Sequence, residues 1–385
     1  MFGSLKAYMD LYRRPGPWSV AYVEAATGTV DTLEAADVRP GNVRAELEAK
    51  GAPDDDVQAV GSAVRPAEGM PGPVAQFVLA RQGSVELNEF LPGPLVVPQR
   101  VSVDPVPDLL PLVKHKGEQF PYVVAEVSRE GGEIRLHHAG KLGADSVEDI
   151  QGSTENLKKV PSGGWSQGKY QHRTEEIWRQ NADQVAAEID RVAARSGAKL
   201  VVLSGDIRAR GLVQEQLSKA SQELVAEVDA NTRTAGADPE LLDREVEKHI
   251  ALRWAAEQQQ VLDRLAEQEG HTNPEAASGL EAVVHALQQG QVDVLVMDDA
   301  ELSDRQRVVL DAEPWVALDQ DESLDAKALG RVAAPSALLR AAALTDARVL
   351  IVPAAALPRR ADVAALLRWP AGAESPASSS APATT

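Results

Sequence analysis

The chain has 385 residues, of which 44% are hydrophobic and 25% charged, the balance of a folded globular protein. At roughly 150 residues per domain, this length predicts two to three domains. There is no cysteine, which excludes disulfides, thiolate zinc sites and cysteine nucleophiles. The sequence contains no signal-peptide pattern at its start and no run of about 18 apolar residues, so we expect a cytoplasmic protein without a membrane partner.

The formal net charge is −19. A protein that coats nucleic acid nonspecifically draws its affinity from many lysine and arginine contacts to phosphate, so this charge argues against that class. A local basic surface remains compatible with an acidic chain, because the field at one site depends mainly on the charges near it.

Residues 1–118 predict an N-terminal α/β domain. Residues 74–81 and 84–91 have strand composition and flank Gln82 and Gly83, a pattern typical of a β-hairpin. No catalytic pattern occurs in this part.

Residues 119–275 predict a central domain. It opens with a second expected hairpin, Tyr122–Ser128 and Glu133–His138, around a turn at residues 129–132. A polar, glycine-containing segment from residue 140 to residue 170 follows, and it is too long for an ordinary connection. Apolar residues then recur at helical spacing from Ile177 onward, with Thr174 as the expected N-cap.

The rest of the central domain predicts a mixed sheet covered by helices. The apolar run Leu200–Leu203 indicates a buried strand, and we interpret Ser204-Gly205-Asp206 as its end rather than as an active site. Residues 238–268 carry the charged and apolar pattern of one long helix, most of which we expect to be a solvated face with an apolar stripe.

Residues 276–370 predict a C-terminal α/β domain, and residues 371–385 have the composition of a disordered tail. The expected elements are a helix at 280–288, a strand at 292–297, an alanine- and leucine-rich segment at 337–343, a strand at 348–352 and a closing helix at 363–369.

The segment GLEAVVHALQQGQVDVLVM, residues 279–297, resembles the opening of the C-terminal domain of archaeo-eukaryotic release factors and Pelota. ALLRAAALTDARVLIVP and VAALLRW look like the final helix, strand and helix of that domain. KVPSGGWSQ, residues 159–167, stands where the family carries its Gly-Gly-Gln loop, but Trp165 and Ser166 separate the glycine pair from Gln167. The resemblance covers about residues 119–370 and extends to bacterial relatives, including ribosome hibernation factors of the Balon type.

This resemblance implies a fold and a set of partners. The fold would be α/β with three domains: a central mixed sheet of RNase H-like character and a C-terminal α/β/α sandwich of the kink-turn-binding ribosomal-protein type would follow the N-terminal domain. The implied partners are the 70S ribosome, through the rRNA of its A site and peptidyl-transferase centre, together with EF-Tu and peptidyl-tRNA. The chain lacks the Asn-Ile-Lys-Ser motif with which true release factors help to read stop codons, so we do not expect stop-codon decoding.

The loop segment is locally basic. Between Asn156 and Arg173 there are four basic residues and no acidic one, a local charge of +4. An exposed indole at Trp165 would stack on a base, worth about 1 to 3 kcal/mol per stacked base. The candidate RNA-binding residues are Lys158, Lys159, Gly163, Gly164, Trp165, Ser166, Gln167, Lys169, His172 and Arg173. The alternative is that Gly163-Gly164 is an ordinary turn and Trp165 covers a small apolar patch.

Three functions remain open. The first hypothesis is a ribosome A-site factor of the hibernation or rescue type, related to the stress response, that sends residues 163–167 toward the peptidyl-transferase centre. The second is an enzyme that releases nascent chains from peptidyl-tRNA, with Gln167 positioning the water. The third is a stress-related interaction protein that no longer binds ribosomes. No metal or cofactor is expected, since His137, His138 and His172 lack partners at metal-ligand spacing.

Overall fold

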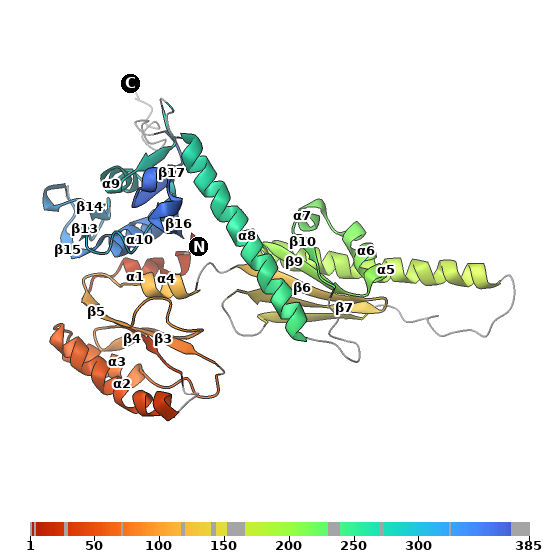
Figure 1. Ribbon diagram of the computed structural model, residues 1–385, viewed down its shortest axis with the longest axis horizontal. Helices are drawn as coiled ribbons and strands as arrows, with labels where there is room; N and C mark the ends of the chain where they lie inside the picture. Colours follow the sequence, from red (N-terminus) through yellow and green to blue (C-terminus); the bar gives the residue numbers. More distant parts are fainter. Residues whose placement is uncertain are drawn as a thin grey trace, which may run out of the picture. The chain divides into compact units, whose positions relative to one another are not determined.

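The computed structural model describes residues 2–3, 5–26, 30–70, 72–116, 120–139, 144–151, 166–229, 239–268, 271, 273–322 and 325–370, with backbone only at 2, 3, 7, 30–37, 166–174 and 239 (Figure 1). The chain divides into two compact units, which are described separately. The first unit contains residues 1–118 and 257–385, and the second contains residues 119–256.

The N-terminal part of the first unit is built on a four-stranded antiparallel sheet with the strand order β4-β3-β2-β5. The predicted hairpin is confirmed, and both turn residues, Gln82 and Gly83, have positive φ angles of 54° and 75°. Helices α2 and α3 pack on one face of this sheet. The elements are α1 (Met9–Tyr12), β2 (Trp18–Glu24), α2 (Val30–Ala49), α3 (Asp54–Ala63), β3 (Val74–Arg81), β4 (Ser84–Pro92), β5 (Arg100–Asp104) and α4 (Leu110–Lys116).

The C-terminal part of the same unit contains a five-stranded sheet with the order β1-β16-β12-β17-β11 and a three-stranded sheet with the order β14-β13-β15. Its elements are β11 (Ala276–Ser278), α9 (Leu280–Gln288), β12 (Val292–Met297), β13 (Gln306–Leu310), β14 (Val316–Ala317), β15 (Ala328–Ala333), α10 (Ala334–Leu344), β16 (Arg348–Ile351) and β17 (Val363–Leu367). Short 3-10 helices lie at Lys6–Tyr8, Gln320–Glu322, Ala354–Ala356 and Pro358–Arg360.

The five-stranded sheet is covered on both faces. Helices α9 and α10 pack on the face that carries Leu295 and Val349. The other face, which carries Val294 and Leu350, packs against Val261 from the last part of helix α8 (Pro239–Gln268). Helix, sheet and helix therefore form three layers, while the kink-turn-binding type of sandwich stays a prediction.

The closing helix predicted at 363–369 is wrong. Residues Val363–Leu367 form strand β17, which pairs antiparallel with β12 and β11 and is buried along its whole length. Alanine and leucine favour helices, but a run of five apolar residues between two hydrogen-bonded strands fits a central strand better than a helix that needs about ten residues.

The first residues of the chain join the C-terminal sheet. Strand β1 (Phe2–Gly3) pairs antiparallel with β16, with Phe2 opposite Leu350. One continuous hydrophobic core then contains Trp18 and Phe77 from the N-terminal sheet together with Leu338 from α10. Residues 1–118 and the C-terminal part thus share a core, and the division of the chain into three domains stays a prediction.

The second unit is a five-stranded mixed sheet with the order β10-β9-β6-β7-β8, in agreement with the mixed sheet predicted for this part. Strands β10, β9 and β6 run parallel to one another, whereas β7 is antiparallel to both of its neighbours, β6 and β8. RNase H-like character stays a prediction. The elements are β6 (Pro121–Ser128), β7 (Gly131–His138), β8 (Ser146–Gln151), α5 (Ser166–Ser196), β9 (Leu200–Gly205), α6 (Ile207–Gln216), α7 (Lys219–Gln222) and β10 (Val225–Glu227).

Helices cover both faces of this sheet as well. Helices α5 and α6 pack on the face that carries Val123 and Leu203, and the first part of α8 packs on the face that carries Val124 and Val202. The predicted long helix is confirmed, but more of it is core than expected, because Leu242, Val246 and Ile250 are all buried. Within the described ranges, no helix has the length and apolar character needed to cross a membrane.

Candidate functional site

The end of the segment predicted to bind RNA is the start of helix α5. The helix begins at Ser166, so Gln167 lies in its first turn and Thr174, the predicted N-cap, lies in its interior. The expectation of a helix that starts at residue 174 is therefore wrong. Lys158, Lys159, Gly163, Gly164 and Trp165 lie outside the described residues, and so do the side chains of Ser166, Gln167, Lys169, His172 and Arg173.

Helix α5 has a buried part and an exposed part. Among its described side chains, from Glu175 onward, the buried face begins at Asn181 and Ala182 and continues through Val185 and Ile189. Residues 175–180 are exposed or half-buried. Figure 1 shows α5 extending well past the end of the sheet on which it packs. With a rise of 1.5 Å per residue, Ser166 lies about 24 Å along the helix axis from Ala182.

A clamp of three contacts holds α5 where its buried face begins, and we name it the Arg129 clamp. The Arg129 guanidinium lies over the Trp178 ring, 4.7 Å from its centroid. The backbone carbonyl of Arg129 accepts a 3.0 Å hydrogen bond from Nδ2 of Asn181. The same guanidinium forms a 3.2 Å ion pair with Asp206. The turn of the β6-β7 hairpin thereby fixes both α5 and the start of α6.

Sequence reasoning placed Arg129 in a turn and gave it no partner. The hairpin is confirmed, but Gly131 and Gly132, expected in the turn, belong to β7, so the turn is two residues long. The signal in the sequence was an asparagine, Asn181, four residues from both Ile177 and Val185 on the apolar face of the predicted helix. Asn181 is buried, and buried polar side chains are nearly always hydrogen-bonded.

The loop at residues 204–206 is structural, in agreement with its interpretation as a strand end. The Asp206 carboxylate caps α6 by accepting hydrogen bonds from the backbone N–H groups of Arg208 and Ala209 at 2.9 and 3.1 Å. Partial burial acts to raise the pKa of Asp206, but the Ala209 N–H and the Arg129 charge outweigh it, and the pKa lies below its ordinary value. The loop therefore stabilises the fold and leaves Asp206 negatively charged.

The two histidines of β7 serve local contacts. The His137 ring stacks on Tyr122, with 5.1 Å between centroids and 9° between planes. His138 Nδ1 lies 2.5 Å from Oδ2 of Asp145. Across the part of the chain that the structure describes, no three histidine, cysteine or acidic side chains gather as a metal site would require. The side chain of His172 is not among the described ones.

Residues 140–170 were predicted as one long connection, and the structure places strand β8 inside it. Strand β8 pairs with β7 over Gly131–Leu136 and forms the edge of the sheet, with side chains alternating between half-buried and exposed. That alternation is typical of a strand with one face on the sheet and one in solvent. The segment left between β8 and α5 is residues 152–165, all outside the described part.

A protein-family comparison matches residues 121–271 to the model described as bacterial archaeo-eukaryotic release factor family 2. Two curated relatives are the uncharacterized proteins MT2704 and Rv2629 of Mycobacterium tuberculosis strains. Each is 27% identical over 307 residues, which cover 80% of this chain and 80% of theirs.

Solved structures similar to this chain include Archaeoglobus fulgidus Pelota, 17% identical with a TM-score of 0.32, which covers 77% of this chain and 79% of that one. A model of ribosome-bound archaeal Pelota and ABCE1 is 14% identical with a TM-score of 0.44 and covers 96% of this chain and 95% of that one. Saccharomyces cerevisiae Dom34, a translation termination-like factor, is 11% identical with a TM-score of 0.39, and the match covers 78% of this chain and 80% of that one.

Proposed function

We propose that this chain, whose residues 121–271 match the model of bacterial archaeo-eukaryotic release factor family 2, is a ribosome-associated factor of the hibernation or rescue type. It occupies the A site and carries residues 163–167 toward the peptidyl-transferase centre. The family match carries the proposal, because it contains the whole of this segment and the helix that follows it.

The geometry of α5 supports this assignment. The segment 163–167 leads directly into α5, and among the described side chains of this helix burial begins at Asn181. Ser166 lies about 24 Å along the helix axis from Ala182, and we interpret the part of α5 before Asn181 as a spacer. Such a spacer suits a segment that must enter a deep RNA-lined cleft while the sheet stays outside. The Arg129 clamp fixes the direction of the spacer at its base.

The charge of the segment supports an RNA partner. Four basic residues between 156 and 173 occur without an acidic one in a chain of net charge −19, so positive charge is concentrated near this end of α5. Gly163 and Gly164 allow the backbone to approach RNA closely, and Trp165 offers a ring for base stacking. The proposed partners are the rRNA of the 70S ribosome and EF-Tu, and the proposed location is the cytoplasm.

Cosedimentation with 70S ribosomes tests the proposal. We expect the wild type to pellet with ribosomes, and Trp165→Ala and the double variant Lys158→Gln/Lys159→Gln to pellet less. The double variant Lys219→Gln/Lys248→Gln removes the same charge from exposed positions elsewhere and serves as the matched control. Binding should weaken with salt, less steeply for the 158/159 variant, because fewer phosphates are neutralised. Failure of the wild type to pellet at either of two salt concentrations would reject ribosome binding and favour an interaction protein of another kind.

Peptide release is the second candidate, and the position of Gln167 is the observation that favours it. Gln167 lies in the first turn of α5, where the backbone N–H groups have no partners within the helix and can donate to a developing negative charge. If the protein hydrolyses peptidyl-tRNA, Gln167→Ala should abolish release from loaded ribosomes while cosedimentation stays unchanged. Release that is equal in the wild type and the variant would remove Gln167 from this role.

A further inference from the structure

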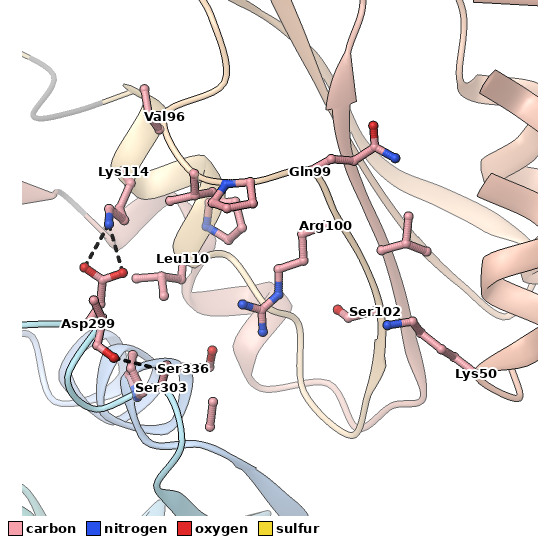
Figure 2. Close-up of a pocket in the computed structure, with 17 residues that line it drawn as sticks. Lys50, Val96, Gln99, Arg100, Ser102, Leu110, Lys114, Asp299, Ser303 and Ser336 are labelled. Atoms are coloured by element: carbon pink, nitrogen blue, oxygen red, sulfur yellow. Dashed lines mark hydrogen bonds and ion pairs between the residues drawn. The ribbon is translucent and has the colours of Figure 1, made fainter. Parts of the chain in front are cut away.

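A pocket of about 660 Å³ lies in the first unit, where the N-terminal and C-terminal parts share their core (Figure 2). One side is formed by the chain leading into β5 and by α4, and the other by the loop after β12 and the start of α10. Lys50, one residue past the end of α2, closes one end. This volume is in the range of pockets that hold small organic ligands.

One buried carboxylate organises the lining. The Asp108 side chain is 2% exposed, and its Oδ2 lies 2.8 Å from Nε of Arg100. Its Oδ1 accepts hydrogen bonds from the Ser336 hydroxyl at 2.9 Å and from the Leu110 N–H at 3.3 Å. Asp108 thus ties β5, α4 and α10 together, and its ion pair with Arg100 has its short distance at Nε, the inner nitrogen of the guanidinium.

Arg100 is placed to meet a ligand. A guanidinium held through Nε still has four N–H bonds on its two terminal nitrogens, a fork that matches a carboxylate or a phosphate. Figure 2 shows the Arg100 side chain extending into the middle of the lining residues. Its side chain is 41% exposed, so the fork is accessible from solvent.

The charges of the lining favour an anion. The lining contains three cations, Lys50, Arg100 and Lys114, and one acid, Asp299, which pairs with Lys114 through both carboxylate oxygens at 2.8 and 2.9 Å. Among the residues that the structure describes, Lys50 forms an ion pair with Glu46, at 3.4 Å and with both side chains more than 40% exposed, an arrangement that contributes little. Arg100 and Lys50 therefore remain as the groups that can attract a ligand.

Two acids that are not part of the lining, Asp104 and Asp108, interact with its cations. Asp108 offsets part of the Arg100 charge, as described above. Burial raises the pKa of Asp104 and Asp108 adds to the rise, while a hydrogen bond from Ser102 and the charges of Arg100 and Lys50 oppose it. The rest of the lining contains apolar side chains, including Pro98, Leu110 and Pro111, and the polar side chains of Gln99, Ser102, Ser303 and Ser336.

We propose that this pocket binds a small organic anion, with its carboxylate or phosphate on Arg100 and Lys50 and its apolar body against Pro98, Leu110 and Pro111. Such a site is independent of the ribosome-directed segment in the second unit. It gives the first unit a ligand-binding role of its own, at a position where the ligand would contact both the N-terminal and the C-terminal parts.

Calorimetric titration of the full chain tests the site, with phenyl phosphate and benzoate as probes that join an apolar ring to each kind of anion. Phenol, which keeps the ring, and inorganic phosphate, which keeps the charge, are the matched controls. We expect at least one of the two probes to bind, and to bind more tightly than phenol and phosphate. No binding of either probe at millimolar concentration would overturn the proposal.

Two variants locate the binding. Lys50→Gln should weaken it about fivefold without loss of fold, because the Lys50 side chain is exposed and its one ion pair is on the surface. Lys248→Gln removes the lysine of an equivalent exposed helix pair with Glu245 and should leave binding unchanged. Arg100→Gln should weaken binding at least about tenfold. Because that change also leaves Asp108 without its ion pair, unfolding is monitored in parallel, and Lys50→Gln decides the case if the Arg100 variant is unstable. Equal affinity of the wild type and Lys50→Gln would place the ligand elsewhere and overturn the proposal.

Discussion

Gly205 lies where strands β6 and β9 of the central sheet come close together. Its φ angle is +105°, and a Cβ atom added to it would lie 2.1 Å from the carbonyl oxygen of Val127. Gly205→Ala should therefore destabilise the second unit by at least about 2 kcal/mol, because neither backbone can move without disturbing the sheet. Gly211→Ala is the control: Gly211 lies in helix α6 with open space around it, so alanine should stabilise by about 0.5–1 kcal/mol. Urea unfolding would measure the change in the free energy of unfolding for each variant. A loss of stability in both variants, or a gain in both, would contradict this account.

Asp206 should make the stability of the second unit depend on pH. Its folded-state pKa is lowered, so its charge stabilises the fold fully above its unfolded pKa near 3.9, and this contribution is lost as the pH falls through the lower folded value. Asp206→Asn keeps a capping side chain but not the charge. We expect the wild type to exceed this variant by about 0.3–1 kcal/mol at pH 7, and the difference to shrink below pH 4.

Unfolding curves at several pH values, followed by tryptophan fluorescence, would measure that difference. Glu215→Gln, which removes an exposed carboxylate from the same helix, is the control. A difference between the wild type and Asp206→Asn that stays constant from pH 7 to pH 3 would show that the charge of Asp206 does not stabilise the cap.

At the scale of elements, helix α5 owes its stability to one face. Ile189 is fully buried among residues of β6, β7 and β9. Ile189→Ala should cost about 2–5 kcal/mol of stability, since it removes three methyl or methylene groups from a packed core and leaves a cavity. Gln184→Ala, an exposed position on the same helix, should change stability by less than about 0.5 kcal/mol. Chemical denaturation of both variants would check this, and a similar loss for both would mean that α5 is not held by this face.

Elements with a strong local pattern could be predicted from the sequence, whereas elements defined by distant partners could not. The hairpin at residues 74–91, the helix at 280–288 and the strand at 292–297 have apolar spacing and turn residues that suffice to define them. The strand Val363–Leu367 was predicted as a helix because its residues favour helices, and only its pairing with β12 and β11 makes it a strand. Strand β1 is two residues long, and its partner lies almost 350 residues away.

The candidate site was predictable to a smaller extent. The basic and glycine-containing segment was recognisable from composition, but the start of α5 at Ser166 was not, because Ser166–Thr174 has no apolar periodicity to mark it. In the Arg129 clamp, Arg129 contacts Trp178, which is 49 residues away in the sequence, and Asp206, which is 77 residues away. Contacts of this kind depend on the packing of the sheet, and a single sequence does not reveal them.

At the scale of the whole molecule, the chain should unfold in more than one step. The core that contains Ile189 belongs to the second unit, and the core that contains Arg340 belongs to the first. Arg340 is 1% exposed, and it donates from Nε to the Tyr12 carbonyl and from Nη1 to the Trp315 carbonyl, each at 3.0 Å. Burial lowers the pKa of Arg340 to about 10, which still leaves it charged at neutral pH. Arg340→Met would leave two carbonyl groups without these donors, at a cost of about 1–3 kcal/mol for each that stays buried.

Scanning calorimetry of the wild type, Ile189→Ala and Arg340→Met would test this expectation. The wild type should show two transitions, with Ile189→Ala lowering the temperature of one and Arg340→Met lowering the temperature of the other. Removing residues 1–14 should lower the same transition as Arg340→Met, because this segment supplies both β1 and the Tyr12 carbonyl. Helix α8 could couple the unfolding of the two units, because it is one continuous helix in which Leu242 packs in the core of one unit and Val261 packs in the core of the other. A single transition lowered by all three changes would mean that α8 couples the two units into one cooperative structure.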